Sequence, residues 1–312
     1  SGGSGAAVAA GLCAAASASD GGGSIRIPAA MNGVFGLKPQ RDRIPLSPLT
    51  EHWQGLSVVG CLTRSVADTA LWLDVVAGGA RRGPPPPDHS FTDAARARPV
   101  PLRIAYSTKP MRLVAPAILS DEVTGAVAET TELLRSLGHR VEARDPAWGL
   151  GGNNFTARYL GGISEEVDRV PMRERLEERT RGFGRLGRPY RGRLMRRARR
   201  AEAKDARRIL SIFDDCDVLI TPVAGETPIE VGRWAGKGAL RTVVGMSRTF
   251  PWCGIWNHLG NPAASVPAGF TEAGMPLAVQ LVGRPNDEET LLSLAAQIEA
   301  ERPWADRRPP VS

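Results

Sequence analysis

Apolar residues recur along this chain at two spacings, one typical of helices and one typical of buried strands. Helices are predicted where apolar residues repeat every three or four positions, behind a capping side chain and before a glycine. Strands are predicted where short apolar runs lie between turn residues. The predicted helices are 66–76 capped by Ser65, a helix to about 137 capped by Ser120 or Asp121, and a helix to about 299 capped by Asn286. The predicted strands are 102–106, 140–143, 217–222, 263–266 and 277–282.

The order of these elements indicates the fold class. Because strands are interleaved with helices, the chain is predicted to be an α/β protein in which helices cover a sheet. Residues 81–90 contain four successive prolines and are predicted to form an exposed loop, whereas residues 148–213 are predicted to be irregular at first and then mostly helical. With 312 residues, 42% of them hydrophobic, the chain can bury a substantial core as one large domain or two smaller ones.

A formal charge of +7 and a pI near 9.7 raise the question of a nucleic-acid partner. The basic excess is highest in residues 173–208, where acidic residues recur at spacings that allow i,i+3 and i,i+4 pairs on a helix. No ladder of aromatic side chains accompanies these charges. A solvated helical face is therefore predicted and nucleic acid is not an expected partner, with an anion- or RNA-binding surface as the alternative. The acidic residues concerned are Glu174, Glu177, Glu178, Glu202 and Asp205.

Several kinds of protein are disfavoured by what the sequence lacks. No apolar run reaches the ~18 residues of a membrane span, and no secretory signal is visible, so a cytoplasmic protein is expected. The four cysteines are scattered without histidine neighbours, which predicts reduced thiols and no metal site. No Walker or Rossmann loop is present, so no cofactor is expected. The cysteines are Cys13, Cys61, Cys216 and Cys253.

The strongest chemical signal is the run Asp20-Gly21-Gly22-Gly23-Ser24. Three consecutive glycines can adopt positive φ and turn several N–H groups toward one point, and a helical turn is predicted to open at Pro28. A hydroxyl beside such donors suits acyl transfer, with a nucleophile next to an oxyanion hole. A tight strand-to-helix turn or a phosphate cradle are the alternatives. A G-x-S-x-G elbow is absent, and none of the four histidines lies in a Ser-His-Asp context, which weighs against an α/β-hydrolase.

Longer motifs around this run carry a family resemblance. They are residues 1–11, the run Gly33-Val34-Phe35-Gly36-Leu37-Lys38-Pro39, residues 257–269, residues 279–283 and Trp304. Together with the glycine-rich run they resemble the amidase signature family, serine amide hydrolases that use a Ser–cis-Ser–Lys triad. The resemblance implies a mixed β-sheet covered by helices on both faces, with residues 1–312 in one amidase domain. It covers most of the chain and is weakest between about 145 and 210.

The resemblance also assigns roles. Ser24 would be the nucleophile that forms an acyl-enzyme with an amide, and Gly21, Gly22 and Gly23 would supply the oxyanion hole. Asp20 and Arg26 would support that turn. The products would be a carboxylate and ammonia or an amine, from a small-molecule amide that the sequence does not identify.

The start of the chain departs from the family pattern. Ser1 matches the second serine of the family's Gly-Gly-Ser-Ser-Gly-Gly run, so the bridging serine and the catalytic lysine would lie upstream of residue 1. Ser1 itself is the alternative bridging serine, and Lys38 belongs to a turn with a structural role in the family. The chain is therefore expected to be the C-terminal portion of an N-terminally truncated amidase and to be inactive alone.

Other functions remain open at this point. The chain could instead be the glutamine-hydrolysing subunit of a tRNA-dependent amidotransferase, or a catalytically inactive fragment. A homodimer is compatible with the sequence. Five aromatic side chains could wall a pocket but are expected to be core packing: Trp148, Phe155, Tyr159, Trp252 and Trp256.

Overall fold

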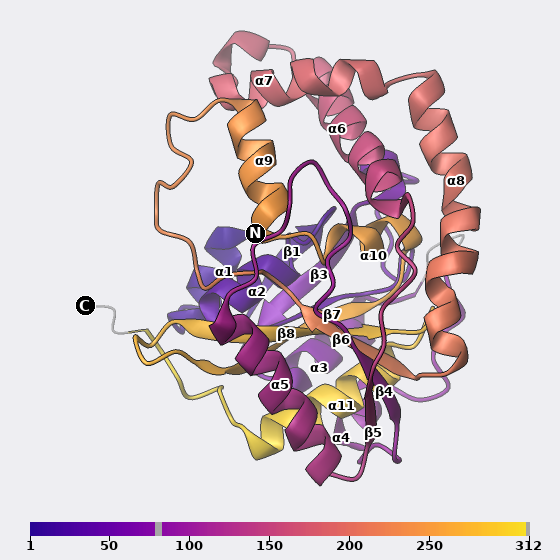
Figure 1. The fold of residues 1–312 in the computed structure, drawn as a ribbon, viewed down its shortest axis with the longest axis vertical. Helices are drawn as coiled ribbons and strands as arrows, with labels where there is room; N and C mark the ends of the chain where they lie inside the picture. The colour runs from indigo at the N-terminus through magenta and orange to yellow at the C-terminus, as the bar shows by residue number, and fades with distance from the viewer. Residues whose placement is uncertain (79–82, 310–312) are drawn as a thin grey trace.

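One mixed sheet of eight strands runs through the molecule in the computed structural model, which describes residues 1–78 and 83–309 (Figure 1). The strands are β1 (Ala15–Asp20), β2 (Phe35–Lys38), β3 (Val58–Thr63), β4 (Arg103–Tyr106), β5 (Arg140–Ala143), β6 (Val218–Pro222), β7 (Ala263–Phe270) and β8 (Pro276–Gly283). Their order is β1-β3-β2-β7-β8-β6-β4-β5. The β4–β5 and β4–β6 pairs are parallel, and the other strand pairs are antiparallel. The predicted mixed α/β fold is confirmed.

Helices connect these strands and cover the sheet. The α-helices are α1 (Gly2–Ala9), α2 (Arg26–Asn32), α3 (Val66–Val76), α4 (Phe91–Arg96), α5 (Asp121–Ser136), α6 (Gly151–Arg169), α7 (Glu178–Gly187), α8 (Arg193–Ile209), α9 (Ala239–Thr249), α10 (Gly254–Leu259) and α11 (Glu288–Glu301). Short 3-10 helices occur at η1 (Trp53–Gly55), η2 (Arg173–Arg175), η3 (Arg188–Tyr190) and η4 (Leu210–Asp214).

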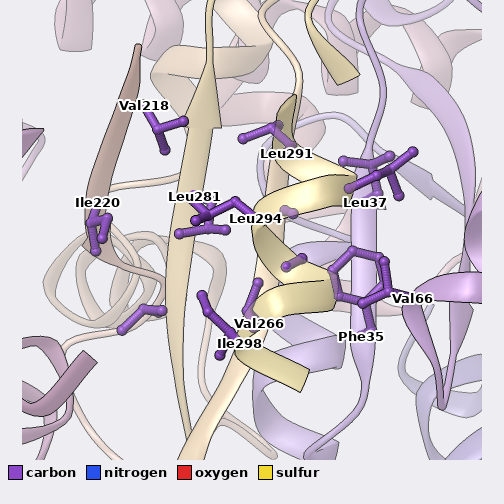
Figure 2. Close-up of a cluster of buried hydrophobic side chains, with 14 of the residues drawn as sticks. Phe35, Leu37, Val66, Val218, Ile220, Val266, Leu281, Leu291, Leu294 and Ile298 are labelled. Atoms are coloured by element: carbon purple, nitrogen blue, oxygen red, sulfur yellow. The ribbon is translucent and has the colours of Figure 1, made fainter. Parts of the chain in front are cut away.

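The largest hydrophobic core lies on one face of the sheet, beneath α3, α4, α5 and α11. Side chains alternate between faces along a strand, so Val218 and Ile220 of β6 enter this core together. Figure 2 shows these two residues and Leu281 of β8 on the strands, facing the α11 side chains such as Leu294. Leu219, between the two β6 residues, belongs to the core on the opposite face.

The opposite face is covered by α6, α8 and α10, whose apolar side chains pack with Leu219 and Val282. Helices α1 and α2 cover the neighbouring part of the sheet, where Ile25 and Ala29 pack with Leu62 of β3. The prediction of helices on both faces is therefore confirmed. The face that carries α2 and α10 also carries the glycine-rich turn, so the turn and the largest hydrophobic core lie on opposite faces of the sheet.

Most elements predicted from the apolar pattern are present. Ser65 caps α3 by accepting a hydrogen bond from the Asp68 N–H at 3.1 Å, and Ser120 caps α5 in the same way with the Val123 N–H at 3.4 Å. The five predicted strands correspond to β4, β5, β6, β7 and β8, although β7 continues four residues beyond the prediction. Capping side chains and uninterrupted apolar runs are local signals, which explains this agreement.

Three local predictions are wrong. Asn286 has φ of +68° and does not cap α11; the cap is Asp287, whose side chain accepts from the Thr290 N–H. Helix α2 begins at Arg26 rather than at Pro28, and the proline is tolerated because the first-turn N–H groups have no intrahelical acceptor. Residues 151–169 are helical throughout as α6, not irregular.

The predicted proline-rich loop falls partly outside the described residues. Residues 83–90 form neither helix nor strand, as predicted, whereas residues 81 and 82 lie outside the described ranges. Within those ranges, no helix combines the length and apolar character needed to cross a bilayer.

The basic stretch is helical but its acidic residues are not all on a solvated face. Glu202 of α8 pairs with the buried guanidinium of Arg158 at 2.6 Å, and Asp205 pairs with the fully buried His258 at 3.1 Å. The predicted i,i+3 pairing holds for Asp205 with Arg208. These acids therefore join α8 to α6 and α10, which corrects the prediction of a simple solvated face.

Candidate active site

The glycine-rich turn joins β1 to α2. Strand β1 ends at Asp20 and α2 begins at Arg26, so Ser24 lies between the end of a strand and the start of a helix. Ser24 is exposed, whereas both Asp20 and Arg26 are fully buried. The turn therefore presents one accessible hydroxyl from an anchored backbone.

Glycine is required in this turn by conformation and by space. Gly23 has φ of +132°, and a Cβ there would lie 2.5 Å from Ile27 Cδ1. A Cβ at Gly21 would lie 2.5 Å from Trp53 Cζ3, which is closer than side-chain atoms approach one another. The turn consequently lies directly against its neighbours with no room for side chains.

The backbone N–H groups of the turn fall into two sets. Gly23 donates its N–H to Asp20 Oδ1 at 2.6 Å, and Ile25 donates to Asp20 Oδ2 at 3.2 Å. Among the described residues, the N–H groups of Gly21, Gly22 and Ser24 have no acceptor. In this conformation Gly21, Gly22 and Ser24 have N–H groups available to a bound anion, whereas Gly23, also predicted for the oxyanion hole, is engaged by Asp20.

Asp20 and Arg26 form a fully buried ion pair beneath the turn. Arg26 Nε and Nη2 each donate to an oxygen of Asp20 at 3.0 Å. Burial alone would raise the pKa of the Asp20 carboxyl, but the Arg26 guanidinium outweighs it and holds that pKa well below its usual range. Burial would likewise lower the pKa of Arg26, and Asp20 reverses that effect and raises it. Both groups are therefore charged at neutral pH.

Two residues from the C-terminal part of the chain complete this network, and sequence reasoning assigned neither a role. Asn257 donates to Asp20 Oδ1 at 2.8 Å and to the Asp20 carbonyl at 2.7 Å, and accepts from Arg26 Nη2 at 2.7 Å. Gln280 accepts from Arg26 Nη1 at 2.6 Å. Both belong to the motifs that carry the family resemblance, and that membership was the only available signal.

Ser1 and Lys38 make other contacts. Ser1 Oγ donates to the Ser19 carbonyl and accepts from its N–H, both at 3.3 Å, so this exposed residue fastens the start of α1 to β1. Lys38 is fully buried and donates to the Pro39 carbonyl at 2.9 Å. Burial, assisted by the Arg26 charge, lowers the pKa of Lys38 well below its usual value. Among the described residues, none forms a hydrogen bond with Ser24 Oγ.

An apolar hollow adjoins the turn at Gly22, bordered by Phe155 and Tyr159 of α6. A Cβ at Gly22 would lie 3.1 Å from Phe155 Cζ and from Tyr159 Cε2. Phe155 packs in a core cluster as expected and Tyr159 packs against that cluster, and both residues border the hollow as well. Trp148, Trp252 and Trp256 are buried in the core as expected. Within residues 1–78 and 83–309, no cluster of three or more His, Cys, Asp or Glu side chains could hold a metal ion.

The tight packing at Gly21 gives a test of the turn. Gly21→Ala should destabilise the protein by about 1–3 kcal/mol, because the added methyl group must displace the Trp53 ring. Gly3→Ala is the matched control, since a Cβ at Gly3 meets nothing within 4 Å and lies in helix α1. It should leave the free energy of unfolding unchanged or raise it by up to ~1 kcal/mol. Urea denaturation measures both, and equal effects would contradict the packing described here.

Comparison with known proteins gives a consistent result. The family model described as Amidase matches residues 1–292. The chain is 49% identical to "Putative amidase AmiB2" of Mycobacterium tuberculosis over 100% of this chain and 66% of that protein. It is 30% identical to "Acylamidase" of Rhodococcus erythropolis, over 97% of this chain and 65% of that protein. The chain thus spans about two thirds of the length of the curated relatives it matches.

Solved structures share the fold. The structure of 6-aminohexanoate cyclic dimer hydrolase is similar with a TM-score of 0.84 and 27% identity, covering 99% of this chain and 68% of that one. A bacterial aryl acylamidase of the amidase signature family is similar with a TM-score of 0.80 and 21% identity, over 99% of this chain and 67% of that one. The latter likeness concerns the fold alone.

Proposed function

The chain belongs to the amidase family, and from this membership we propose that it carries the serine nucleophile, Ser24, of an enzyme that hydrolyses carboxylic amides. The observation that carries the proposal is the exposed Ser24 hydroxyl on a turn anchored by the buried Asp20–Arg26 pair. A rigid support of this kind keeps a nucleophile in reacting position.

In the proposed reaction, Ser24 Oγ attacks the carbonyl carbon of the amide and forms a tetrahedral intermediate. The free N–H groups of the turn, those of Gly21, Gly22 and Ser24, receive the negative oxygen, and each such donor is worth about 3 kcal/mol in a transition state. Gly21 and Gly23 give the turn its shape. The carbon–nitrogen bond then breaks, the serine proton passes to the leaving nitrogen, and an acyl ester remains on Ser24. Water cleaves this ester to release a carboxylic acid and regenerate the hydroxyl.

Proton transfer needs a general base within hydrogen-bond reach of Ser24 Oγ. No described residue occupies that position, and Lys38 donates to Pro39 instead. We therefore place the base, a lysine acting through a bridging serine as the family resemblance implies, outside residues 1–312. Such a lysine must have a lowered pKa to accept a proton at neutral pH. No metal or cofactor takes part in this proposal.

A fluorophosphonate probe tests the proposal, because it reacts with activated serines. In the protein expressed from its complete reading frame, Ser24 should be labelled strongly, as located by mass spectrometry of the modified peptide. Residues 1–312 alone should be labelled weakly, since a serine hydroxyl without a base is a poor nucleophile. Strong labelling of the short form would mean that a residue within it, with Ser1 and Lys38 the first candidates, supplies the base. Labelling at another serine would reject the assignment of Ser24.

A further inference from the structure

The apolar hollow beside Gly22 is built from segments far apart in the sequence. Helices α6, α7 and α9 provide most of its wall, and α7 packs against both of the others. In Figure 1 these three helices stand together on one side of the sheet. Among the lining residues are Phe155, Thr156 and Tyr159 of α6, Phe183 of α7, and Val243 and Ser247 of α9.

The lining has a uniform chemical character. No acidic or basic side chain belongs to it, although the chain as a whole is rich in arginine. Its polar groups are the backbone at Gly22 and the hydroxyls of Thr156, Tyr159 and Ser247. The Thr156 hydroxyl donates to the Gly152 carbonyl, whereas the Tyr159 hydroxyl has no partner among the described residues. The hollow therefore offers apolar contact together with an unoccupied hydrogen-bonding group.

We propose that this hollow binds the apolar substituent, aromatic or aliphatic, of an uncharged amide. The inference rests on the proposed role of Ser24, because Gly22 both borders the hollow and belongs to the turn that presents the nucleophile. Burial of an apolar group against these side chains is favourable. The Tyr159 hydroxyl is available to hold a polar atom of the same ligand.

The same lining disfavours charged amides. The α-amino and α-carboxylate groups of glutamine would each lose water on entering the hollow, and no charged side chain there would replace it. The hollow therefore favours a hydrolase of neutral, apolar amides over the glutamine-hydrolysing alternative.

Binding of three small amides tests this directly. The ligands are 3-phenylpropanamide, with its apolar group on the acyl side, N-benzylacetamide, with its apolar group on the amine side, and glutamine. The protein is the Ser24→Ala form of the complete reading frame, so that no turnover occurs, and calorimetry measures the dissociation constants. At least one phenyl ligand should bind tenfold or more tightly than glutamine. The tighter of the two identifies the side of the amide that enters the hollow.

A substitution on α9 locates the binding. Val243 lines the hollow and is half-buried, so Val243→Asp should weaken binding of the preferred phenyl ligand at least tenfold by placing a charge in the hollow. Leu240→Asp is the matched control on the same helix, because Leu240 is 62% exposed and does not line the hollow. It should leave binding unchanged. Tyr159→Phe should weaken binding of the amide but not of propylbenzene, which has no polar group.

These results distinguish failure of the proposed binding hollow from failure of the proposed nucleophile. Glutamine binding as tightly as both phenyl ligands would overturn the proposal, as would unchanged binding in Val243→Asp, even if Ser24 is labelled by the probe. Conversely, tight phenyl binding with no labelling of Ser24 would preserve the hollow and reject the nucleophile. The ligand comparison uses no substitution in the hollow, so it decides the question even if Val243→Asp does not fold.

Discussion

Replacing Ser24 by alanine should reduce amide hydrolysis about 10³- to 10⁶-fold in the protein expressed from its complete reading frame. Removal of the nucleophile from a serine hydrolase leaves only the contribution of the oxyanion donors and of substrate binding. Ser24 is exposed and forms no hydrogen bond with another described residue, so the substitution should not disturb the fold. Release of ammonia or amine measures the rate, and thermal melting checks the fold.

Ser4→Ala is the matched control for this loss. Ser4 lies on α1 and donates its hydroxyl to the Ser17 carbonyl at 2.9 Å, away from the glycine-rich turn in sequence and in hydrogen bonding. Loss of the Ser4 hydroxyl should change the rate of amide hydrolysis by less than tenfold, because the substitution removes only one surface hydrogen bond. A Ser24→Ala protein that retains near-normal turnover would reject the proposed nucleophile, whatever Ser4→Ala does.

The turn was predictable because its signals are local. Three glycines followed by a serine specify a tight strand-to-helix connection, and the structure has that connection between β1 and α2. The buried partners of the turn were not predictable from the residues alone. Asn257 lies 237 residues beyond Asp20, and only the packing of α10 against the β1–α2 turn brings their side chains together. Family motifs identified the segment but not the contact.

Two other differences show where local signals fail. Strand β1, Ala15–Asp20, was missed because its small and polar residues form no apolar run; it is an edge strand held by its ladder to β3. Helix α6 was missed at its start because glycines have low helix propensity. A Cβ at Gly152 would meet the Arg112 carbonyl and one at Gly162 would meet the Trp53 ring. Glycine at these positions lets neighbouring segments pack closely against α6, and that packing outweighs the low helix propensity of glycine.

The candidate chemistry was predicted less completely than the fold. Asp20 and Arg26 were expected to support the turn, and they form a fully buried ion pair beneath it. The hollow was only the alternative in the sequence analysis, because Phe155 and Tyr159 are aromatic residues of a kind that usually packs in cores. Their position beside Gly22 depends on how α6 packs against α10 and η1, and the spacing of residues along the chain does not contain that information.

Asp20→Asn should destabilise the protein by about 3–5 kcal/mol at pH 7, the second large effect expected here. The substitution leaves the Arg26 guanidinium buried without a counter-charge, a situation that costs this much in proteins. It also weakens the bonds that Gly23 and Ile25 make to the carboxylate. The matched control is Glu142→Gln, whose pair with Arg140 is exposed, and it should change stability by less than about 1 kcal/mol.

The effect of Asp20→Asn should also depend on pH. Because the folded protein holds the pKa of Asp20 well below that of an unfolded aspartate, about 3.9, the ionised carboxylate stabilises the fold at all pH values above about 4. This stabilisation is lost progressively as the pH falls below that value, since the unfolded state then binds the proton first. The difference in unfolding free energy between wild type and Asp20→Asn should therefore shrink as the pH falls from about 4 to about 3.

Arg26→Met separates charge from packing in the same network. Alone it should destabilise as strongly as Asp20→Asn, because Asp20 is then buried without its partner. Combined with Asp20→Asn it should cost clearly less than the sum of the two, because neither buried charge remains. Urea unfolding of the four proteins gives this coupling energy directly. Additive losses, or a pH-independent effect of Asp20→Asn, would show that the pair does not anchor the turn through its charges. The support proposed for Ser24 would then rest on two neutral partners, Asn257, which donates to the Asp20 carbonyl, and Gln280, which accepts from Arg26.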